Sequence, residues 1–500
     1  MRKQTKLVAV LSAAALLAIG ASMTSFAASG KWVEENGTWV YYNRSGEKVT
    51  EEWAKSGDYW YWLNEDGEMA TNTLVEDDNN RYYVNENGTM VQNRWVSIEN
   101  EDYDDEPMNY WYYFGANGKA YKSTTNSNNA SFKTINGKKY IFDDEGKMLY
   151  GWINLYGEKE TGDEAWQNGV FYCGDENDGA QKAGEWAYLD IIDNTYDSVS
   201  PGTSSPNTFD DEDQTRWFYF KTNGRKMTGE KGKTINGKKY SFDEYGRMNA
   251  EWVYYANSTA TATPVETATG SDGLAGQGTK NYTTGFRYYG DPESGARKTK
   301  GWFQVVPDSY LNVSDYDDDA DAWYYSDKDG KLVASEMKTI NGKKYAFNEY
   351  GKMQSGLKAV KFVGTSTTDI DEIKGDDKVP GLPFDTEENF KASVSGLYAA
   401  GYKLYYFGAS SDGAMKTGKQ NVTIDGDTFT FLFNKSGSFK GQGKFGLDDH
   451  KYYAGGMLMA AAREDRYAVV KLVQDASGNY KAITLMTTDD FLSDVRDGSA

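Results

Sequence analysis

Two adjacent stretches of equal length decide the fold: KWVEENGTWVYYNRSGEKVTE at residues 31–51 and EWAKSGDYWYWLNEDGEMATN at residues 52–72. Each begins with a charged residue and a tryptophan, continues through a short aromatic run and ends after a glycine-containing turn. The opening position recurs every 21 residues, at Trp32, Trp53, Leu74 and Trp95. A short fixed period predicts one small structural unit that is copied along the chain and packs mainly on its neighbours.

Each unit has the pattern of a β-hairpin. Short runs of aromatic and β-branched residues lie between Gly, Asn and Asp residues, as strands usually do. These runs are Trp39–Tyr42, Trp60–Leu63 and Trp111–Phe114. The segment Thr-Ile-Asn-Gly-Lys-Lys-Tyr occurs three times, starting at residues 134, 234 and 339, and its Asn-Gly pair is the strongest short-range hairpin signal. Because a single hairpin is not stable alone, we expect an all-β, elongated solenoid of tandem β-hairpin repeats.

The units differ in length at one place. The opening tryptophan precedes the second aromatic residue by seven positions in Trp53 to Trp60, but by 65 positions in Trp152 to Trp217. This pattern predicts inserted loops that leave one face of the solenoid. At the C-terminus, residues 466–473 and 480–486 are typical of two strands and residues 487–495 of a short helix, which together predict a β-rich cap.

We therefore expect four parts: a signal peptide at 1–27, N-terminal β-hairpin repeats at 28–150, repeats with long insertions at 151–356, and degenerate repeats with the cap at 357–500. The first part has a basic start, an apolar run and the small-residue cleavage pattern of a secretory signal. No other apolar stretch is long enough to cross a bilayer. The chain has a single cysteine, Cys173, so we expect a secreted bacterial surface protein without an internal disulfide framework.

Charge and composition narrow the class of partner. The 54 basic and 75 acidic residues give a net charge of −21, which disfavours nucleic acid and suits a cationic or neutral partner. Aromatic residues make up 15% of the chain. One interpretation is that they fill the small contacts between hairpins. The other is that rings at grooves between hairpins stack on sugars or enclose a quaternary ammonium by cation–π attraction.

The segment from Trp53 to Met69 resembles the choline-binding or cell-wall-binding repeat, with its Gly-Trp opening, aromatic run and Gly-x-Met ending. The Asn-Gly-Lys-Lys units are similar to repeats of the same superfamily in clostridial toxins and in glucan-binding regions of glucosyltransferases. The resemblance covers residues from about 31 to 356 and is patchy from 357 to 443. It implies a wall-bound surface protein whose partner is cell-wall polymer with choline or glycan, and a host glycan is an alternative partner.

The resemblance also implies which aromatic residues bind the ligand. In that family a cage takes the opening Trp of a unit, the first aromatic residue of its hairpin and an aromatic residue of the next unit. Carried over, this predicts one cage from Trp32, Trp39 and Trp62 and another from Trp53, Trp60 and Tyr83. Trp95 and Trp111 are further candidates.

Several units depart from the family pattern. Leu74 replaces an opening Trp and Arg81 replaces a second aromatic residue, while Lys139, Lys239 and Lys344 occupy the same aromatic column in the Asn-Gly-Lys-Lys units. Because a cation at that place repels choline, we expect these units to act as spacers or carbohydrate grooves and only the N-terminal units to keep intact cages.

We expect no enzyme, cofactor or metal site. His450 is the only histidine and Cys173 the only cysteine, so a Ser-His-Asp, Cys-His or multi-histidine zinc site is not expected. The acidic run Asp315–Asp321 has carboxylates that Ca²⁺ could use, but it lacks the glycine and closing glutamate of a helix-loop-helix site and is typical of a solvated loop. The favoured function is a non-catalytic wall-binding protein or adhesin. The alternative is a wall hydrolase whose active site lies in the insertions or the C-terminal region.

Overall fold

The computed structural model describes residues 30–101, 107–123, 129–193, 212–255, 263–264, 277–375, 383–461 and 466–498. The predicted signal peptide, residues 1–27, lies outside this set. The chain divides into two compact units. The first comprises Met1–Ile192 and Phe218–Met227, and the second comprises Asp193–Trp217 and Thr228–Ala500. The predicted part boundaries at residues 150 and 356 stay predictions.

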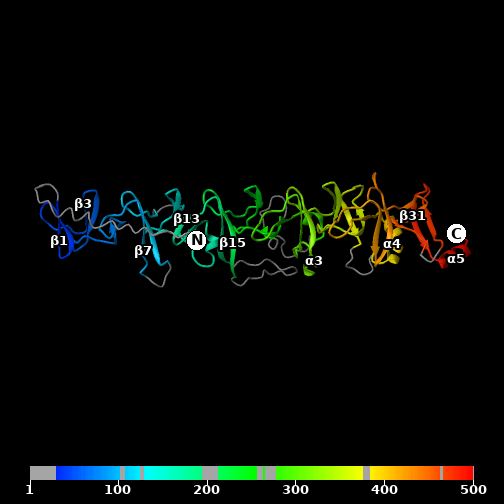
Figure 1. Ribbon diagram of the computed structural model, residues 1–500, viewed down its shortest axis with the longest axis horizontal. Coiled ribbons are helices and arrows are strands. Elements are labelled where there is room, and N and C mark those ends of the chain that lie inside the picture. The colour runs from blue at the N-terminus through cyan, green and yellow to red at the C-terminus, as the bar shows by residue number, and fades with distance from the viewer. Residues whose placement is uncertain are drawn as a thin grey trace. The chain divides into compact units, whose positions relative to one another are not determined.

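The first unit is a series of antiparallel hairpins that follow one another in chain order (Figure 1). Its elements are β1 (Lys31–Glu35), β2 (Thr38–Tyr42), β3 (Glu52–Ser56), β4 (Tyr59–Leu63), β5 (Thr73–Asp77), β6 (Asn80–Val84), β7 (Arg94–Glu99), β8 (Asn109–Phe114), β9 (Lys133–Ile135), β10 (Lys138–Tyr140), β11 (Gly151–Ile153), α1 (Ala165–Asn168), β12 (Phe171–Asp175), β13 (Asp178–Gln181) and β14 (Glu185–Asp193), while β15 (Glu212–Phe220) spans the division between the units.

The second unit continues the hairpins and ends in a larger sheet. Its elements are β16 (Lys233–Ile235), β17 (Lys238–Tyr240), β18 (Glu251–Tyr254), β19 (Thr263–Pro264), α2 (Lys280–Thr283), β20 (Phe286–Tyr289), β21 (Gly301–Val305), α3 (Val313–Asp317), β22 (Ala322–Ser326), β23 (Glu336–Ile340), β24 (Lys343–Phe347), β25 (Leu357–Phe362), β26 (Ile370–Lys374), α4 (Glu387–Ala399), β27 (Lys403–Tyr406), β28 (Gly418–Ile424), β29 (Asp427–Phe433), β30 (Gly446–Asp448), β31 (Lys451–Ala454), β32 (Met457–Leu458), β33 (Val469–Gln474), β34 (Tyr480–Met486) and α5 (Thr488–Arg496).

The turns confirm the hairpin prediction. Asn136 and Gly137 join β9 to β10 with φ angles of 49° and 83°, the left-handed pair that a two-residue hairpin turn requires. A second turn follows each hairpin, and in it the N–H of Gly67 donates to the carbonyl of Asn64 at 2.9 Å. The residue two positions after that glycine, Met69, bridges back to Leu63 at the end of β4. Each repeat is therefore a hairpin with a short third segment.

A recurring contact joins each repeat to the one before it. The N–H of Met69 donates to the carbonyl of Trp39 at 2.7 Å, and the N–H of Met90 donates to that of Trp60 at 2.8 Å. The thioether of Met69 also fills the space beside the turn glycine of the next repeat, since a Cβ at Gly88 would lie 2.8 Å from its sulfur. The Gly-x-Met ending of the repeat is therefore the part that locks successive hairpins together.

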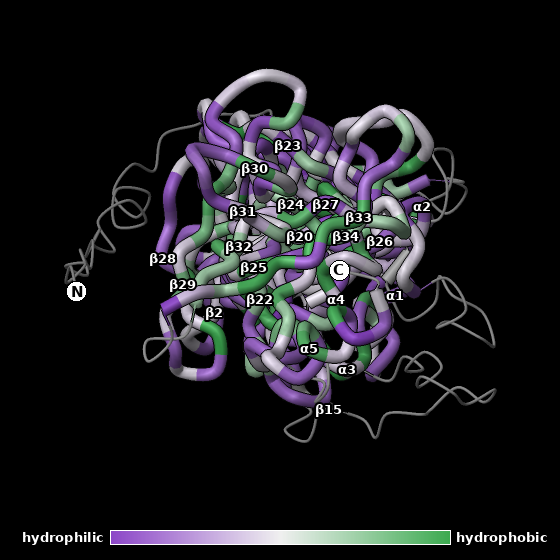
Figure 2. The backbone as a smooth tube through the Cα atoms, turned by 90° about the vertical axis from the view of Figure 1, so that its right-hand side faces the viewer, coloured by the Kyte–Doolittle hydropathy of each residue, from purple (hydrophilic) through white to green (hydrophobic). Residues whose placement is uncertain are grey.

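The cores are small and lie between neighbouring hairpins. In the first unit, Val75, Tyr82 and Val84 form one such cluster, while the second unit has a larger one in which Phe390 and Val394 of α4 pack on Phe431 of β29. In Figure 2 the hydrophobic segments run mainly along strands and the turns are mostly hydrophilic. None of the helices in the described part of the chain has the length and apolar character needed to cross a bilayer.

The structure adds helices to the predicted all-β fold. The insertions contain the short helices α1, α2 and α3 rather than loops only, and the region after residue 357 contains the 13-residue helix α4. The C-terminal hairpin β33–β34 and the helix α5 are present as predicted. The helix spans Thr488–Arg496 rather than 487–495, because the hydroxyl of Thr487 accepts the N–H of Asp490 and caps it.

Candidate ligand-binding junctions between hairpins

We use "junction" for the contact between the tryptophan-bearing face of one hairpin and the hairpin that follows it. Side chains alternate between the two faces of a strand, so register decides which residues share a junction. In β1–β2, Trp32 pairs with Tyr41 and Glu34 pairs with Trp39, which places these four side chains on one face. In β3–β4, Ala54 pairs with Tyr61 on the face opposite to Trp53 and Trp62.

The first junction brings together aromatic residues of two hairpins. The ring of Trp32 lies 5.1 Å from that of Tyr41 and 5.4 Å from that of Tyr61 in the next hairpin. Trp39 lies on the same face and directly opposite Glu34. Both tryptophans are partly exposed. This junction therefore combines two accessible indole rings with a carboxylate, a favourable setting for a cation.

The second junction has similar rings and charged groups of both signs. Trp53 lies 5.3 Å from Trp62 and 5.0 Å from Tyr82 of the next hairpin, and its indole N–H donates to the carboxylate of Asp77 at 3.1 Å. Trp60 is 38% exposed, and the ammonium of its cross-strand partner Lys55 lies 5.7 Å from its ring centroid. A cation of the chain therefore already lies over the ring that a cationic ligand would use.

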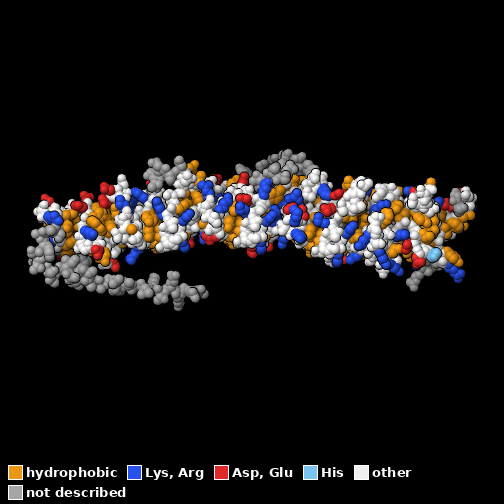
Figure 3. Space-filling model, turned by 90° about the horizontal axis from the view of Figure 1, so that it is seen from above, with side chains coloured by type: hydrophobic (Ala, Val, Ile, Leu, Met, Phe, Trp, Pro, Cys, Tyr) orange, Lys and Arg blue, Asp and Glu red, His pale blue; other side chains and the backbone are white. Residues whose placement is uncertain are grey.

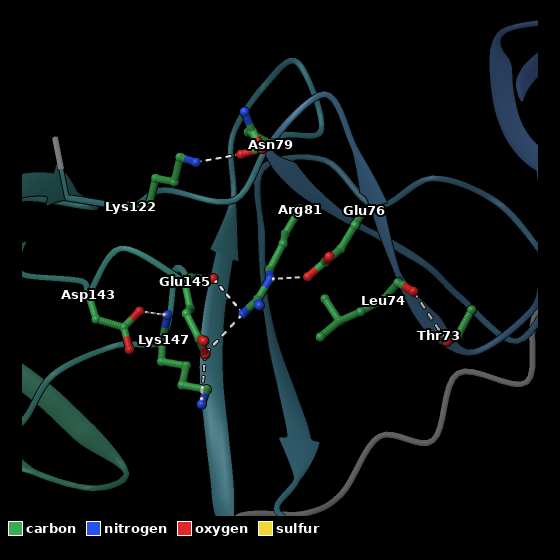
Figure 4. Close-up of polar contacts among 9 residues, drawn as sticks. All are labelled: Thr73, Leu74, Glu76, Asn79, Arg81, Lys122, Asp143, Glu145 and Lys147. Atoms are coloured by element: carbon green, nitrogen blue, oxygen red, sulfur yellow. Dashed lines mark hydrogen bonds and ion pairs between the residues drawn. The ribbon is translucent and has the colours of Figure 1, made fainter. Parts of the chain in front are cut away.

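The third junction has an ion-pair network where the others have a second aromatic residue. Arg81 lies in the aromatic column of β6, as predicted, and its Nε donates to Glu76 at 2.9 Å. Its Nη1 contacts the carboxylate of Glu145 at 3.3 Å, and Lys147 contacts the same carboxylate at 2.9 Å (Figure 4). The hydrogen bond from Lys147, with Arg81 beside it, lowers the pKa of the Glu145 carboxyl. The charged side chains at this position therefore pair with one another.

The fourth junction and one in the second unit have the same geometry. Trp95 lies 5.2 Å from Tyr113, 4.9 Å from Tyr140 and 6.5 Å from Trp111. In the second unit, the distances of Trp302 are 5.2 Å to Tyr325, 4.8 Å to Tyr345 and 6.4 Å to Trp323. In both cases a tryptophan hairpin packs on an Asn-Gly-Lys-Lys hairpin. These two junctions are structurally equivalent.

At the junction of Trp152, the protein supplies its own cation. Lys226 follows a turn glycine at the position that Met69 has elsewhere, and its N–H donates to the carbonyl of Val170 at 2.7 Å. Its side chain is buried, with the ammonium 5.0 Å from the ring of Trp152 and 5.9 Å from that of Phe218. The same ammonium donates to the carbonyls of Trp166 and Gln167 in α1.

The predicted site residues lie at these junctions, with one shift in grouping. Trp62 lies at the second junction with Trp53 rather than at the first with Trp32, and Tyr83 lies on the face of β6 that turns to the third junction. The reason is the two-residue period of a strand, which turns Tyr61 and Tyr82 back towards the preceding hairpin. Whether the grouped residues bind a ligand stays a prediction.

Two tryptophans that the sequence interpretation left out share this geometry. Trp302 and Trp323 were not among the predicted site residues, although they show the same Trp–Trp–Tyr pattern as Trp95, Trp111 and Tyr140. The signal was the recurrence of the pattern although the spacing from Trp302 to Trp323 is 21 positions rather than seven. In the first junction, the carbonyl of Trp39 accepts the inter-repeat hydrogen bond. The carbonyls of Lys239 and Lys344 accept the same bond in their repeats, so these lysines hold the position of Trp39, as predicted.

The acidic insertion has a structural partner. Asp315 is buried in α3 and forms an ion pair with Lys352 at 3.0 Å, so it is not part of a solvated loop. Across the described residues, no three His, Cys, Asp or Glu side chains are grouped closely enough to hold a metal ion.

Comparison with known proteins adds to this geometry. The family model of the choline-binding repeat matches residues 49–95, the segment that includes the second junction. Residues 49–95 thus have the sequence pattern of a choline-binding repeat. Glucosyltransferase-S of Streptococcus mutans serotype c is 25% identical over 244 residues, which is 43% of this chain and 16% of that protein. The chain thus spans less than a fifth of that relative's length.

Solved structures that are similar include choline binding protein F from Streptococcus pneumoniae, with 17% identity, a TM-score of 0.32 and coverage of 87% of this chain and 99% of that one. The modular autolysin LytC from the same organism has 18% identity, a TM-score of 0.33 and coverage of 67% of this chain and 55% of that one.

Proposed function

We propose that the chain is a non-catalytic bacterial surface protein that binds cell-wall polymer through the junctions between its hairpins. The group bound at a junction is the choline substituent of the polymer, and attachment to the wall is non-covalent. Junctions that lack a free aromatic pair serve as spacers. Repeats that are not engaged by the wall remain available for a host glycan, which is the adhesin form of the proposal.

The first junction is the observation that carries this proposal. Trp32 and Trp39 are partly exposed, the buried ring of Tyr61 in the next hairpin packs against Trp32, and the carboxylate of Glu34 lies across the strand from Trp39. A quaternary ammonium has no N–H donor, so ring faces and a nearby negative charge are the groups that recognise it. Each such contact contributes roughly 0.5–2 kcal/mol. A single junction therefore binds weakly.

Repetition supports a useful total affinity. The first, second and fourth junctions and the Trp302 junction each keep two tryptophans, and a wall polymer displays its substituents in many copies. Binding one junction raises the effective concentration of the polymer at the others, and avidity can exceed a single affinity by about 10²–10⁴. On the face seen in Figure 3, hydrophobic side chains reach the surface between charged ones, and the net charge of −21 suits a cationic substituent.

Retention on choline resin tests the proposal. We expect the secreted chain to be retained and to be released by free choline, and calorimetry with choline to give more than one weak site. The matched comparison is Trp39→Ala against Tyr156→Ala, because Tyr156 is an exposed aromatic residue in the turn after β11 and is far from the first junction in the chain. Failure to bind choline and wall would overturn the proposal, and release of soluble sugar from purified wall would favour a hydrolase.

A further inference from the structure

A cavity of about 500 Å³ lies beside the three-stranded sheet β11–β12–β13. Its lining includes Tyr150, Tyr172, Asp175, Glu176 and Asn177. A volume of this size is ordinary for a small-molecule site. Tyr172 also pairs with Trp152, so the cavity adjoins the Trp152 junction, where the ammonium of Lys226 already lies against the indole ring.

The backbone beside the cavity is irregular. A β-bulge interrupts the pairing of β12 with β13 between Cys173 and Asp175, and bulges re-aim side chains beside functional sites. Gly174 is required there, since a Cβ would lie 1.8 Å from the carbonyl oxygen of Asp178. A Cβ at Gly151, by contrast, would meet no atom within 4 Å. Both glycines have positive φ angles, of 42° and 77°.

The polar groups of the cavity are partly used and partly available. Oδ1 of Asp175 accepts the N–H groups of Asn177 and Asp178 at 2.9 Å, which fixes the β12–β13 turn. Oε1 of Glu176 accepts from the amide of Asn177 at 3.3 Å. Among the contacts of the described residues, none engages the second oxygen of either carboxylate. Two carboxylate oxygens therefore remain as acceptors next to two aromatic rings.

A positive charge completes the set. The ammonium of Lys159 lies 3.4 Å from the ring centroid of Tyr150, so one face of this ring already carries a cation of the chain. That face of the ring is therefore not open to a second cation. An anion would meet Asp175 and Glu176. A neutral ring with many hydroxyl groups satisfies all three features, because hydroxyls donate to carboxylates and the ring's C–H face packs on tyrosine.

We propose that this cavity is a subsite for a neutral pyranose unit of a glycan, held between Tyr150 and Tyr172 and hydrogen-bonded by Asp175 and Glu176. It is distinct from the proposed choline junctions and does not depend on them. A polymer that carries both sugar and choline would engage both kinds of site. The sugar site would then distinguish polymers by their backbone rather than by their substituent.

Titration of the full chain with maltotriose, isomaltotriose and triacetylchitotriose tests this subsite, followed by calorimetry and by the fluorescence of Trp152, whose ring lies 5.0 Å from that of Tyr172. We expect at least one of these sugars to bind. Tyr150→Ala and Glu176→Ala should each weaken that binding about tenfold, a loss of about 1.4 kcal/mol. Asn177→Trp, at an exposed position on the rim, should block it without removing a lining ring.

Matched controls are Tyr156→Ala and Glu164→Ala, since both residues are exposed in the same unit and neither lines the cavity. Their sugar affinity should equal that of the unchanged chain. The proposal is overturned if none of the three sugars binds, if Tyr150→Ala and Asn177→Trp bind sugar normally, or if tetramethylammonium competes for the site. Choline-resin retention of the same variants should not change, so failure of the subsite and failure of the choline proposal are separate results.

Discussion

The first junction and the Trp152 junction have similar ring contacts but differ in the side chain that locks the repeats together. Both place an opening tryptophan against a ring of the following segment, at 5.4 Å for Trp32 and Tyr61 and at 5.2 Å for Trp152 and Phe218. In the first, the residue that locks the repeats is Met69, and the rings of Trp32 and Trp39 remain partly exposed. In the second, the locking residue is Lys226, and its ammonium lies against the rings.

This difference shows that a single side chain can decide whether a junction is open to a cation. The ring arrangement attracts an ammonium group in either case. At the Trp152 junction the ammonium is covalently part of the chain and is anchored by carbonyls of α1, a helix that only this insertion provides. The open junction is left for a ligand. Four kinds of change can break or sharpen this comparison.

Removal of the internal cation should have the largest effect. Lys226→Ala leaves a cavity beside Trp152 and two carbonyls of α1 without their donor, so the free energy of unfolding should fall by about 2–4 kcal/mol. Thermal unfolding measures this loss. Cys173 gives a local readout, because burial raises the pKa of its thiol to about 12 and little thiolate is present at pH 8. Labelling of Cys173 should be faster in the variant, and methylammonium should slow it again.

The control for that change is Lys48→Ala, because Lys48 holds the equivalent position after the first turn glycine but is exposed. Its effect on unfolding should lie within about 0.5 kcal/mol. Equal stability of the two variants would show that the ammonium of Lys226 does not hold the Trp152 junction together.

Removal of a ring from the open junction should have the next largest effect. Trp39→Ala should weaken choline binding at the first junction by about 2- to 30-fold, the equivalent of 0.5–2 kcal/mol for a lost cation–π contact. The inter-repeat hydrogen bond uses the backbone carbonyl of Trp39, so the substitution leaves it intact. Calorimetry should show one site fewer, with the melting temperature little changed. An unaltered number of sites would place choline elsewhere.

The repeat, its turns and its locking motif could be predicted from the sequence, because each depends on residues close together in the chain. Asn136 and Gly137 need positive φ angles, and Gly88 must leave room for Met69, so these positions are marked by residue type. The pairing of Trp32 with Tyr61 rather than Trp62 could not be predicted as readily, because it depends on which face of a hairpin turns towards its neighbour.

Two other features were missed for different reasons. The sequence around α4 carries a helix signal, since Thr386 caps the helix and Phe390, Val394 and Leu397 are spaced along one face, but the same region contains fragments of the hairpin repeat, which predict strands. The role of Lys226 had no local signal. A lysine after a turn glycine is usually exposed, as Lys48 is, and only the carbonyls of α1, 59 and 60 residues away, make its burial possible.

Exchange of charges between the first two junctions should have a smaller effect. Glu34 and Lys55 hold equivalent positions, each opposite a second-column tryptophan. Glu34→Lys should weaken choline binding at the first junction about threefold, and Lys55→Glu should strengthen it at the second by a similar factor, because exposed charges at this range contribute about 0.5–1 kcal/mol. Both changes in choline affinity should be smaller at high salt. If neither variant differs from the unchanged chain in choline affinity, the cross-strand charge does not affect binding at the junctions.

The smallest effect is expected at the third junction, where charged side chains form ion pairs with one another. Arg81→Ala should lower the free energy of unfolding by less than about 1 kcal/mol, because Glu76 and Glu145 are both well exposed partners and such pairs are screened by water. It should not create a choline site, since Leu74 still replaces the opening tryptophan and supplies no ring face. The double change Leu74→Trp with Arg81→Trp restores both rings, and calorimetry should then count one further choline site than in the unchanged chain. If Arg81→Ala alone adds a choline site, then Arg81 itself excludes choline from the third junction. In that case the replacement of the opening tryptophan by Leu74 does not prevent binding.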